Sequence, residues 1–314
     1  MLSGCQIGDL VSIYADVHKK CKKGFQKLFE DEGKLFIGNG IVKMQRYQLF
    51  SNNIVQKGIA VEVKETTSGC PSIGDDFLPS GTALLQNLPS IICVACLDPQ
   101  PGDTVLDMCA SPGNKTTHIA ELTRNQGTIV AIDKTKNKVK QLKALCEKFG
   151  AKVHCFEADS TKIVALSQIS DKTVCDGPPF SPEAFDRILL DAPCSVLGKR
   201  PQIVNRLSKK EIRSYVPIQR KLFESAVKLL KPNGTLVYST CTITLAENEA
   251  MVAWALKTFE NLKLIKPKIT MGSPGWAGVL ADEDRRLVQR FGSECDVDSV
   301  GFFFACFVKK KEEK

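Results

Sequence analysis

Two cysteines and an aspartate follow two apolar segments of the sequence. Asp191 and Cys194 lie in D-R-I-L-L-D-A-P-C-S, and Cys241 lies in G-T-L-V-Y-S-T-C-T. If these segments are adjacent parallel strands, roughly 4.8 Å apart, both thiols can reach one small volume. A thiolate that adds to C6 of a cytosine makes C5 enamine-like, so that C5 can attack a methyl sulfonium. Asp191, if protonated, could meet the charge that develops towards N3; the residues alone leave open which cysteine attacks.

Three further aspartates end or follow successive apolar segments. Asp107 lies in D-M-C-A-S-P-G-N-K-T-T, Asp133 ends I-V-A-I-D, and Asp159 lies in F-E-A-D-S-T. The Pro-Gly turn after Asp107 lets the backbone approach a ligand, and the helix that it opens offers free N–H groups. An acidic residue that ends the second strand can accept hydrogen bonds from ribose hydroxyls. The pattern predicts an adenosine cofactor. The pattern does not match a dinucleotide-binding site or a P-loop, because G-x-G-x-x-G and the four-residue P-loop spacer are absent.

Other cysteines give no comparable signal. Cys93 and Cys96 form a C-x-x-C, but a zinc site needs a second pair or two suitably spaced histidines. His18, His118 and His154 are the three histidines, and none has that spacing. We therefore expect no metal, and we expect Cys93 and Cys96 to be buried helix residues.

Such residues need a sheet that brings strand ends together, and the sequence predicts one from residue 82 onwards. Its apolar segments do not alternate with polar residues, so both faces of each strand should be buried, as in a mostly parallel, doubly wound α/β sheet. The expected strands are Thr104–Cys109, Thr128–Ile132, Val153–Glu157, Arg187–Asp191, Leu236–Ser239 and Gly301–Val308. The expected helices are Lys115–Thr123, Thr135–Phe149, Ser208–Leu230 and Ala246–Lys257.

The N-terminal part of the chain has a different character. Residues 1–64 are expected to be mostly β, and residues 65–81 are rich in helix- and strand-breaking residues and should form a linker. Gly38-Asn39-Gly40 predicts a turn that favours positive φ. The remaining expected elements here are strands at Leu10–Tyr14, Lys34–Ile37 and Ile59–Val63 and a helix at Met44–Phe50.

Charge and composition are compatible with an anionic partner. The 314 residues carry a formal net charge of +8, and the densest basic cluster is H-K-K-C-K-K at residues 18–23, which could equally be a solvated loop. No stretch of eighteen apolar residues and no signal peptide is found, so we expect no membrane span. The 13 cysteines are then expected to be reduced thiols, with the cytoplasm as the first location and the nucleus as the second.

Taken together, these segments resemble the Sun-domain RNA cytosine-5 methyltransferases. The resemblance covers nearly the whole chain and is closest to the type with a PUA (pseudouridine synthase and archaeosine transglycosylase) domain before the catalytic domain. It rests on D-M-C-A-S-P-G-N-K-T-T-H-I-A, F-D-R-I-L-L-D-A-P-C-S, Q-R-K-L-F and L-V-Y-S-T-C-T-I-T-L-A-E-N-E, and on G-D-L-V-S-I-Y-A-D through L-F-I-G-N-G-I for the PUA part. It implies a Rossmann-like class I methyltransferase domain at residues 82–314, after an N-terminally truncated PUA domain at residues 1–64.

The resemblance also implies a role for individual residues. Cys241 would be the nucleophile, Cys194 would help to release the product, and Lys115 would lie near the target base, with Asp191 beside them. S-adenosylmethionine would contact Cys109, Ala110, Ser111, Pro112, Gly113, Asn114, Lys115, Asp133, Asp159 and Asp191. The implied substrate is RNA: tRNA near its acceptor end, with the PUA domain holding the CCA tail, and also mRNA. We expect the chain to act as a monomer.

Four departures from the family pattern bear on activity. Asn114 and Val196 stand where the family usually has glycine, and Asn114 is expected to tolerate a positive φ. Val196 could crowd the base pocket or stiffen its loop. The stretch between Arg290 and Ser299 is shorter than in the family, so helical material before the last strand is expected to be missing, and the PUA domain lacks its first strands.

Two alternatives follow. The first is a weakly active copy that binds cofactor or RNA without efficient turnover. The second is an amino-group or DNA cytosine methyltransferase. Gly177-Pro178-Pro179-Phe180 superficially resembles the amino-enzyme motif, but it precedes its strand and is better explained as a loop turn.

Overall fold

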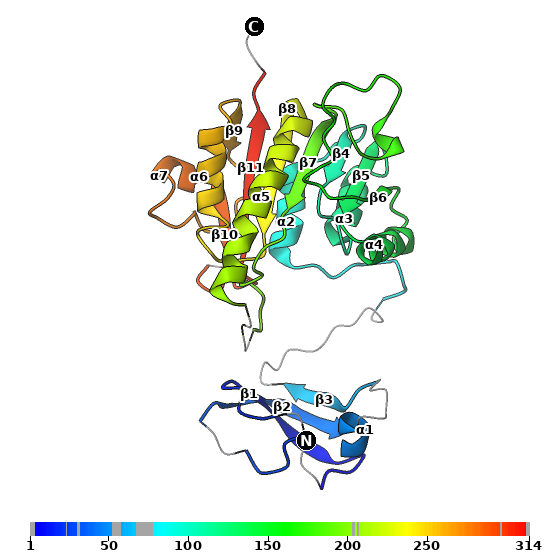
Figure 1. Ribbon diagram of the computed structural model, residues 1–314, viewed down its shortest axis with the longest axis vertical. Helices are drawn as coiled ribbons and strands as arrows, with labels where there is room; N and C mark the ends of the chain where they lie inside the picture. The colour runs from blue at the N-terminus through cyan, green and yellow to red at the C-terminus, as the bar shows by residue number, and fades with distance from the viewer. Residues whose placement is uncertain are drawn as a thin grey trace. The chain divides into compact units, whose positions relative to one another are not determined.

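The computed structural model divides the chain into two compact units, and each is described by itself. It describes residues 4–22, 24–29, 32–51, 58–66, 78–202, 205, 207–295 and 297–311. The smaller unit comprises Met1–Gly74 with Gln202–Asn205, and the larger comprises Asp75–Pro201 with Arg206–Lys314 (Figure 1). In the described residues, no helix is both long and apolar enough to cross a membrane.

The smaller unit is a three-stranded antiparallel sheet with one short helix. Its elements are β1 (Leu10–Asp16), β2 (Lys34–Val42), α1 (Arg46–Phe50) and β3 (Val61–Thr66), in the sheet order β1-β2-β3. The predicted turn at Gly38-Asn39-Gly40 is wrong, because these residues lie inside β2. A Cβ at Gly38 would stand 2.1 Å from the backbone oxygen of Glu65 on β3, so the close approach of two strands, not a turn, requires this glycine.

The larger unit confirms the doubly wound α/β fold. Its sheet has the order β10-β11-β8-β7-β4-β5-β6, with β9 also paired to β11. The strands β4 to β8 are parallel to one another, whereas β9, β10 and β8 each pair with β11 in antiparallel fashion. Their bounds are β4 Thr104–Asp107, β5 Thr128–Asp133, β6 His154–Glu157, β7 Phe185–Asp191, β8 Leu230–Thr240, β9 Leu262–Ile265, β10 Val288–Phe291 and β11 Phe302–Lys309.

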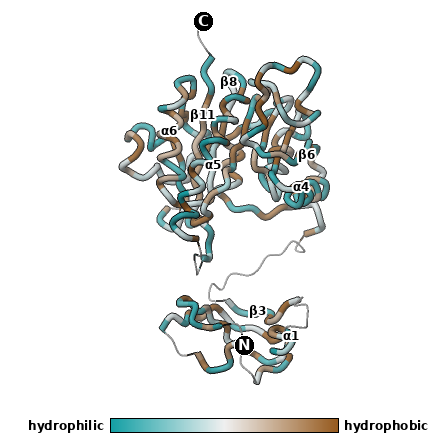
Figure 2. The backbone as a smooth tube through the Cα atoms, in the orientation of Figure 1, coloured by the Kyte–Doolittle hydropathy of each residue, from teal (hydrophilic) through white to brown (hydrophobic). Residues whose placement is uncertain are grey.

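Helices cover both faces of this sheet. One face packs against α5 and α6, and the other against α2, α3 and α4. Figure 2 shows hydrophobic residues concentrated in the middle of this unit and hydrophilic residues along α4. The bounds are α2 Leu88–Leu97, α3 Asn114–Leu122, α4 Lys136–Lys148, α5 Lys209–Leu229, α6 Glu249–Thr258 and α7 Asp282–Arg285, with a 3-10 turn at Val174–Asp176.

The core of the larger unit explains why its strands are apolar at successive positions. Successive residues of β7 face opposite sides of the sheet, and both sets are buried: Ile188 and Leu190 pack with the α5 side, and Leu189 packs with the α2 side. Each such side chain contributes roughly 1.5–3 kcal/mol when it is removed from water. This two-sided burial fixes the strand ends on which the polar residues lie.

Candidate active site

The register between β7 and β8 brings the two cysteines together. The strands are parallel, and Asp191 on β7 is paired with Ser239 on β8. Cys194 lies three residues beyond the first, and Cys241 two residues beyond the second. Their Sγ atoms are 3.4 Å apart; Cys194 is buried and Cys241 is half-buried.

The two thiols do not ionise equally. The pKa of Cys241 is lowered, first by the hydrogen bond that it shares with Cys194 and also by the positive charge of Lys115. The pKa of Cys194 is raised, first by the same contact and then by burial. Because the thiolate is the nucleophilic form, this arrangement favours Cys241 over Cys194 as the attacking residue.

Lys115 and Asp191 form an ion pair beside the thiols. Lys115 Nζ lies 2.7 Å from Asp191 Oδ2, and Ser239 Oγ donates to Asp191 Oδ1 at 2.7 Å. Burial, the largest single influence, favours neutral Lys115, but the charge and hydrogen bond of Asp191 act together with the charges of Cys93 and Asp107 and raise the Lys115 pKa. Both oxygens of Asp191 thus accept hydrogen bonds, one from Lys115 and one from Ser239. Lys115 is therefore a second candidate, besides a protonated Asp191, for the group that donates a proton or hydrogen bond to the base.

Asp107 provides a buried oxygen without a partner. Thr116 Oγ1 donates to its Oδ2 at 2.7 Å, but its Oδ1 has no hydrogen-bond partner in the structure. Burial raises the pKa of Asp107 to about 7. An orphaned carboxyl oxygen at the end of β4 suits a ligand that donates a hydrogen bond, as the amino group of S-adenosylmethionine can.

Two other aspartates lie at the neighbouring strand ends. Asp133 ends β5 and accepts from the backbone N–H of Ser111 at 3.1 Å, which ties it to the turn before α3. Asp159, after β6, accepts from the hydroxyl of Thr161 at 2.7 Å and pairs with Lys134 at 3.1 Å. These contacts, that of Thr161 first, lower the pKa of Asp159 to about 2. Carboxylates ending adjacent strands are the expected arrangement for binding ribose hydroxyls.

The turn before α3 differs from the expectation for Asn114. Gly113, with φ +117°, adopts the positive φ, and Asn114 is the first residue of the helix. A Cβ on Gly113 would lie 3.0 Å from a methyl group of Leu142 in α4. Asn114 therefore stands at a position that any L-residue can adopt, and it does not strain the turn that Cys109, Ala110, Ser111 and Pro112 lead into.

Val196, in contrast, is strained. Its φ is +54°, and its side chain is 41% exposed. A β-branched residue is a genuine outlier at this φ. The departure at Val196 therefore has a structural cost, borne by the loop that carries Cys194.

We expect Val196→Gly to raise the free energy of unfolding by roughly 0.5–1 kcal/mol, because relief of left-handed strain exceeds the added entropy of glycine. Urea denaturation measures the change. Val196→Ala is the control, since it shortens the side chain but keeps a Cβ at positive φ. Equal stability of the Gly and Ala variants would contradict the strain.

We expect Asp107→Asn to stabilise the protein at pH 8 and to leave it unchanged near pH 4. The folded-state pKa of about 7 lies above the ordinary value of 3.8. The stability that this proton contributes is present below pH 3.8 and is lost as pH rises through 7. Asparagine cannot ionise and still accepts from Thr116, so the gain at pH 8 should be on the order of 2–4 kcal/mol.

Urea denaturation at both pH values measures this effect, with the exposed Asp171→Asn as the control. A variant whose stability follows the wild-type pH curve would contradict a buried, proton-holding Asp107.

The structure also adds residues that the sequence analysis missed. Glu247, Asn248 and Glu249 are fully buried. The sequence predicts that all three lie in a helix that starts at Ala246. The helix α6 starts only at Glu249, because the first two side chains bind the neighbouring loops instead. The sequence contains a feature that could have indicated these residues: A-E-N-E has three polar residues in a row directly after the Cys241 segment.

The 290s segment is compact. Arg290, 2% exposed, forms an ion pair with Glu249 and donates to the backbone oxygen of Ile243 at 3.1 Å. Between Phe291 and Phe302, the described residues (all but 296) contain no helix.

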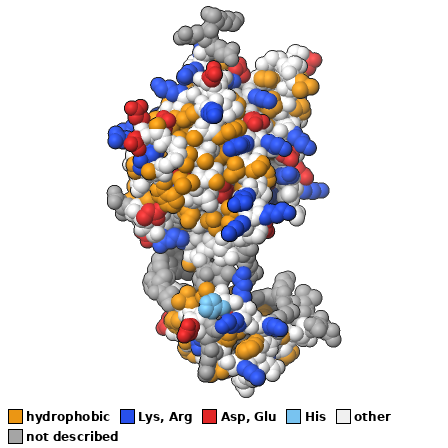
Figure 3. Space-filling view, turned by 60° about the vertical axis from the view of Figure 1, so that its left-hand side comes forward, with side chains coloured by type: hydrophobic (Ala, Val, Ile, Leu, Met, Phe, Trp, Pro, Cys, Tyr) orange, Lys and Arg blue, Asp and Glu red, His pale blue; other side chains and the backbone are white. Residues whose placement is uncertain are grey.

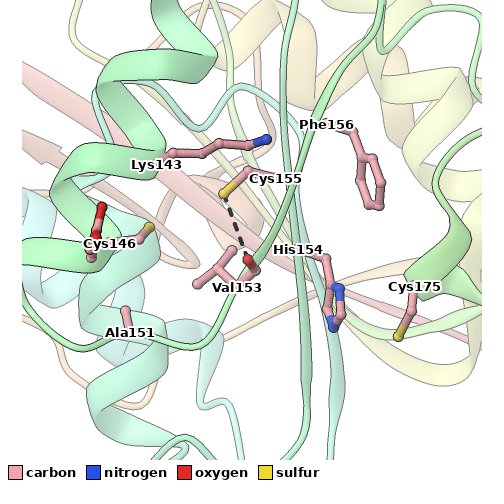
Figure 4. A pocket seen from close by; sticks show the side chains of 9 residues that line it. Lys143, Cys146, Ala151, Val153, His154, Cys155, Phe156 and Cys175 are labelled. Atoms are coloured by element: carbon pink, nitrogen blue, oxygen red, sulfur yellow. Dashed lines mark hydrogen bonds between the residues drawn. The ribbon is translucent and has the colours of Figure 1, made fainter.

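Cysteines elsewhere form other contacts. Cys93 and Cys96 are buried in α2, and no group of three metal-ligating side chains occurs among the described residues. A separate cavity of about 430 Å³ lies between α4 and β6, where Cys146 and Cys155 point towards one another (Figure 4). None of the residues that line it belongs to the predicted site. Gly177-Pro178-Pro179-Phe180 follows the 3-10 turn as a loop before β7, as expected.

Comparisons with known proteins identify the family of this chain. Residues 94–305 match the family described as 16S rRNA methyltransferase RsmB/F. The chain is 44% identical to human tRNA (cytosine(72)-C(5))-methyltransferase NSUN6, over 97% of this chain and 69% of the relative. It is 34% identical to tRNA (cytosine(72)-C(5))-methyltransferase of Pyrococcus horikoshii, over 94% of this chain and 69% of the relative.

A solved structure gives the same result. The crystal structure of NSun6 from Pyrococcus horikoshii with SFG superposes with a TM-score of 0.74 at 31% identity, over 99% of this chain and 70% of that chain. The fold, the family match and the relatives concur. The chain belongs to the Sun-domain family of RNA cytosine-5 methyltransferases, which use S-adenosylmethionine as the methyl donor.

Proposed function

We propose that this chain methylates carbon 5 of a cytosine in tRNA through a covalent bond between Cys241 and C6 of the base. The single observation that carries the proposal is the 3.4 Å contact between the Cys194 and Cys241 thiols. It lies beside the Lys115–Asp191 ion pair, at the end of the sheet where Asp107, on the neighbouring strand β4, offers an unpartnered oxygen.

The cofactor would be held by residues at or just after the ends of β4, β5 and β6. Asp133 and Asp159 would accept from its ribose and adenine side, and the turn from Cys109 to Lys115 would enclose it. S-adenosylmethionine supplies an electrophilic methyl group when bound. The unpartnered Oδ1 of Asp107 supports this assignment, since it offers an acceptor that the protein itself does not use.

The chain's own residues would then divide the work. The Cys241 thiolate adds to C6, and the proton that Lys115 carries can meet the negative charge that develops on the base. After C5 has taken the methyl group, the C5 proton must leave and the Cys241–C6 bond must break. The C5 proton passes to a water molecule, and its electron pair re-forms the C5–C6 double bond and expels Cys241 as a thiolate. Cys194, whose Sγ lies 3.4 Å from that of Cys241, is placed to stabilise the departing thiolate with its S–H group.

The proposed substrate is tRNA at cytosine 72, near the CCA end, with mRNA as a further substrate. The names of the human and Pyrococcus relatives support position 72. Many Lys and Arg side chains on the face of the larger unit drawn in Figure 3 suit a phosphate backbone. Residues 1–64 would form the PUA-like RNA-binding domain, whereas most of the linker predicted at residues 65–81 lies outside the described residues. We place the enzyme, as a monomer, in the cytoplasm, where its free cysteines would stay reduced.

Incubation with labelled S-adenosylmethionine and a tRNA transcript ending in CCA tests this proposal. We expect label on the transcript, and none when cytosine 72 is replaced by uracil. A fragment of mRNA serves as the third arm. Cofactor binding in calorimetry without any transfer would refute the proposal and favour a weakly active copy, for which the strained Val196 loop would be the first cause to examine.

A further inference from the structure

Glu247 begins a run of three buried polar residues directly after the Cys241 loop. Glu247, Asn248 and Glu249 are each 0% exposed. Burying a charged or amide group costs free energy unless it is hydrogen-bonded. The contacts of these side chains therefore identify what they hold in place.

The carboxylate of Glu247 touches both cysteine loops. Its Oε2 accepts from the backbone N–H of Ser195 at 3.0 Å, and its Oε1 accepts from the Ser195 hydroxyl at 2.5 Å. Its Oε1 also accepts from the hydroxyl of Thr244 at 2.9 Å. Ser195 follows Cys194, and Thr244 lies three residues after Cys241. One side chain therefore binds both the loop that carries Cys194 and the loop that carries Cys241.

Two further contacts complete this network. Gln219 on α5 donates through Nε2 to the backbone oxygen of Pro193 and to Glu247 Oε2, both at 3.0 Å. The hydroxyls of Ser195 and Thr242 are 2.7 Å apart. The Cys194 loop is thus held from α5 on one side and from the Cys241 loop on the other.

Asn248 and the backbone of Glu247 hold the Cys241 loop itself. Asn248 Oδ1 accepts from the Thr240 hydroxyl at 2.6 Å, and its Nδ2 donates to the backbone oxygen of Thr242 at 3.1 Å. These are the two residues that flank Cys241. The hydroxyl of Tyr238 donates to the backbone oxygen of Glu247 at 2.7 Å, which anchors the segment to β8.

This hydrogen-bond network holds the two loops beyond the ends of β7 and β8. Ladder pairing between β7 and β8 fixes the chain as far as Asp191 and Ser239, but both thiols lie beyond it. We infer that Glu247 is a positioning residue that holds Cys194 against Cys241, so that Cys194 lies where it can assist release once Cys241 has added to the base. The inference rests on the proposed function for its chemical meaning, although the geometry stands on its own.

Glu247→Gln tests this role with little change in volume. In one orientation the N–H₂ group of the carboxamide faces the Ser195 N–H and Gln219, which also donate. In the other it faces the hydroxyls of Ser195 and Thr244, which would have to turn from donating to accepting. Either orientation therefore breaks or reverses two hydrogen bonds that hold the two loops together. Asp186→Asn is the matched control. It removes a carboxylate, paired with Lys231 at 2.9 Å, near the opposite end of β7.

Phenylarsine oxide is the probe, because a trivalent arsenical binds two neighbouring thiols together. Mass mapping distinguishes the Cys194–Cys241 site from other thiol pairs, and Cys241→Ala supplies the background. Turnover on the tRNA transcript, the KM for S-adenosylmethionine and the melting temperature are measured on the same preparations. The arsenical measurement needs no RNA, so it reports on Glu247 even if wild type transfers no methyl group.

We expect Glu247→Gln to lose arsenical binding at this pair and to lower kcat about 10²-fold, as a displacement on the order of 1 Å can. The KM for S-adenosylmethionine should stay at the wild-type value, because Glu247 contacts none of the residues assigned to the cofactor. Asp186→Asn should keep both arsenical binding and kcat.

If Glu247→Gln does not fold, Ser195→Ala supplies the test. It keeps the carboxylate and the backbone hydrogen bond and should move both measurements in the same direction by less. Wild-type arsenical binding and kcat in a folded Glu247→Gln variant would overturn the inference, even if its melting temperature fell.

Discussion

Cys241→Ala abolishes methyl transfer to RNA, and Cys194→Ala leaves the protein covalently attached to its substrate: these are the largest effects that we expect. The first change removes the thiol whose pKa is lowered by its neighbour, and the loss should be on the order of 10⁴- to 10⁶-fold. The second keeps the nucleophile but removes the group that would assist release. Label transfer and a denaturing gel, run side by side, measure both.

Cys155→Ala is the control for these variants. Cys155 points towards Cys146 in the cavity between α4 and β6 (Figure 4), and none of the predicted site residues lines this cavity. It should transfer label as wild type does and show no covalent band. Full activity of Cys241→Ala would contradict its role as the nucleophile. A covalent band only with Cys241→Ala would mean that the roles of the two cysteines are reversed.

Arg290→Met should lower the free energy of unfolding by about 3–5 kcal/mol, because it leaves the buried Glu249 carboxylate without its cation. The guanidinium of Arg290 bonds both oxygens of Glu249, at 2.5 and 2.8 Å, and the two side chains are 2% and 0% exposed. It also stacks on Trp276, with 3.7 Å between the guanidinium carbon and the ring centre. Urea denaturation gives the size of the loss.

An exposed ion pair provides the comparison. Arg200 pairs with Asp298, and the two side chains are 46% and 72% exposed. Arg200→Met should therefore cost about 1 kcal/mol or less. Adding Glu249→Gln to Arg290→Met should recover part of the loss, since the unpaired charge is then gone. Similar losses in Arg290→Met and Arg200→Met would contradict the buried pair.

The central sheet could be predicted because its strands are apolar on both faces. The segments that became β7 and β11 are short runs of large hydrophobic residues, and their position along the chain gives the alternation with helices. The pairing of Asp191 with Ser239 follows from two such strands being adjacent. This is why the meeting of Cys194 and Cys241 was expected from residue types and positions.

Other elements depend on contacts between distant residues. The strand β10 reads V-Q-R-F, and its Gln289 and Arg290 give it no apolar pattern. Arg290 is buried because Glu249 lies against it, 41 residues away. The reason for a glycine was also ambiguous in the sequence. Gly38 is required because the backbone of Glu65 on β3 comes close to it, and not because the chain turns there. Sequence patterns report local preference and burial, whereas these features depend on tertiary partners.

The most direct test of the covalent mechanism uses wild-type protein and a tRNA transcript containing 5-fluorocytidine. After attack at C6 and methyl transfer to C5, fluorine stands in place of the proton that must leave, so the enzyme should stay bound. Digestion and mass spectrometry then identify the attached residue. We expect the nucleotide on the peptide that contains Cys241, only when S-adenosylmethionine is present. Attachment to Cys194, or turnover without any attached nucleotide, would contradict the assignment of Cys241 as the nucleophile.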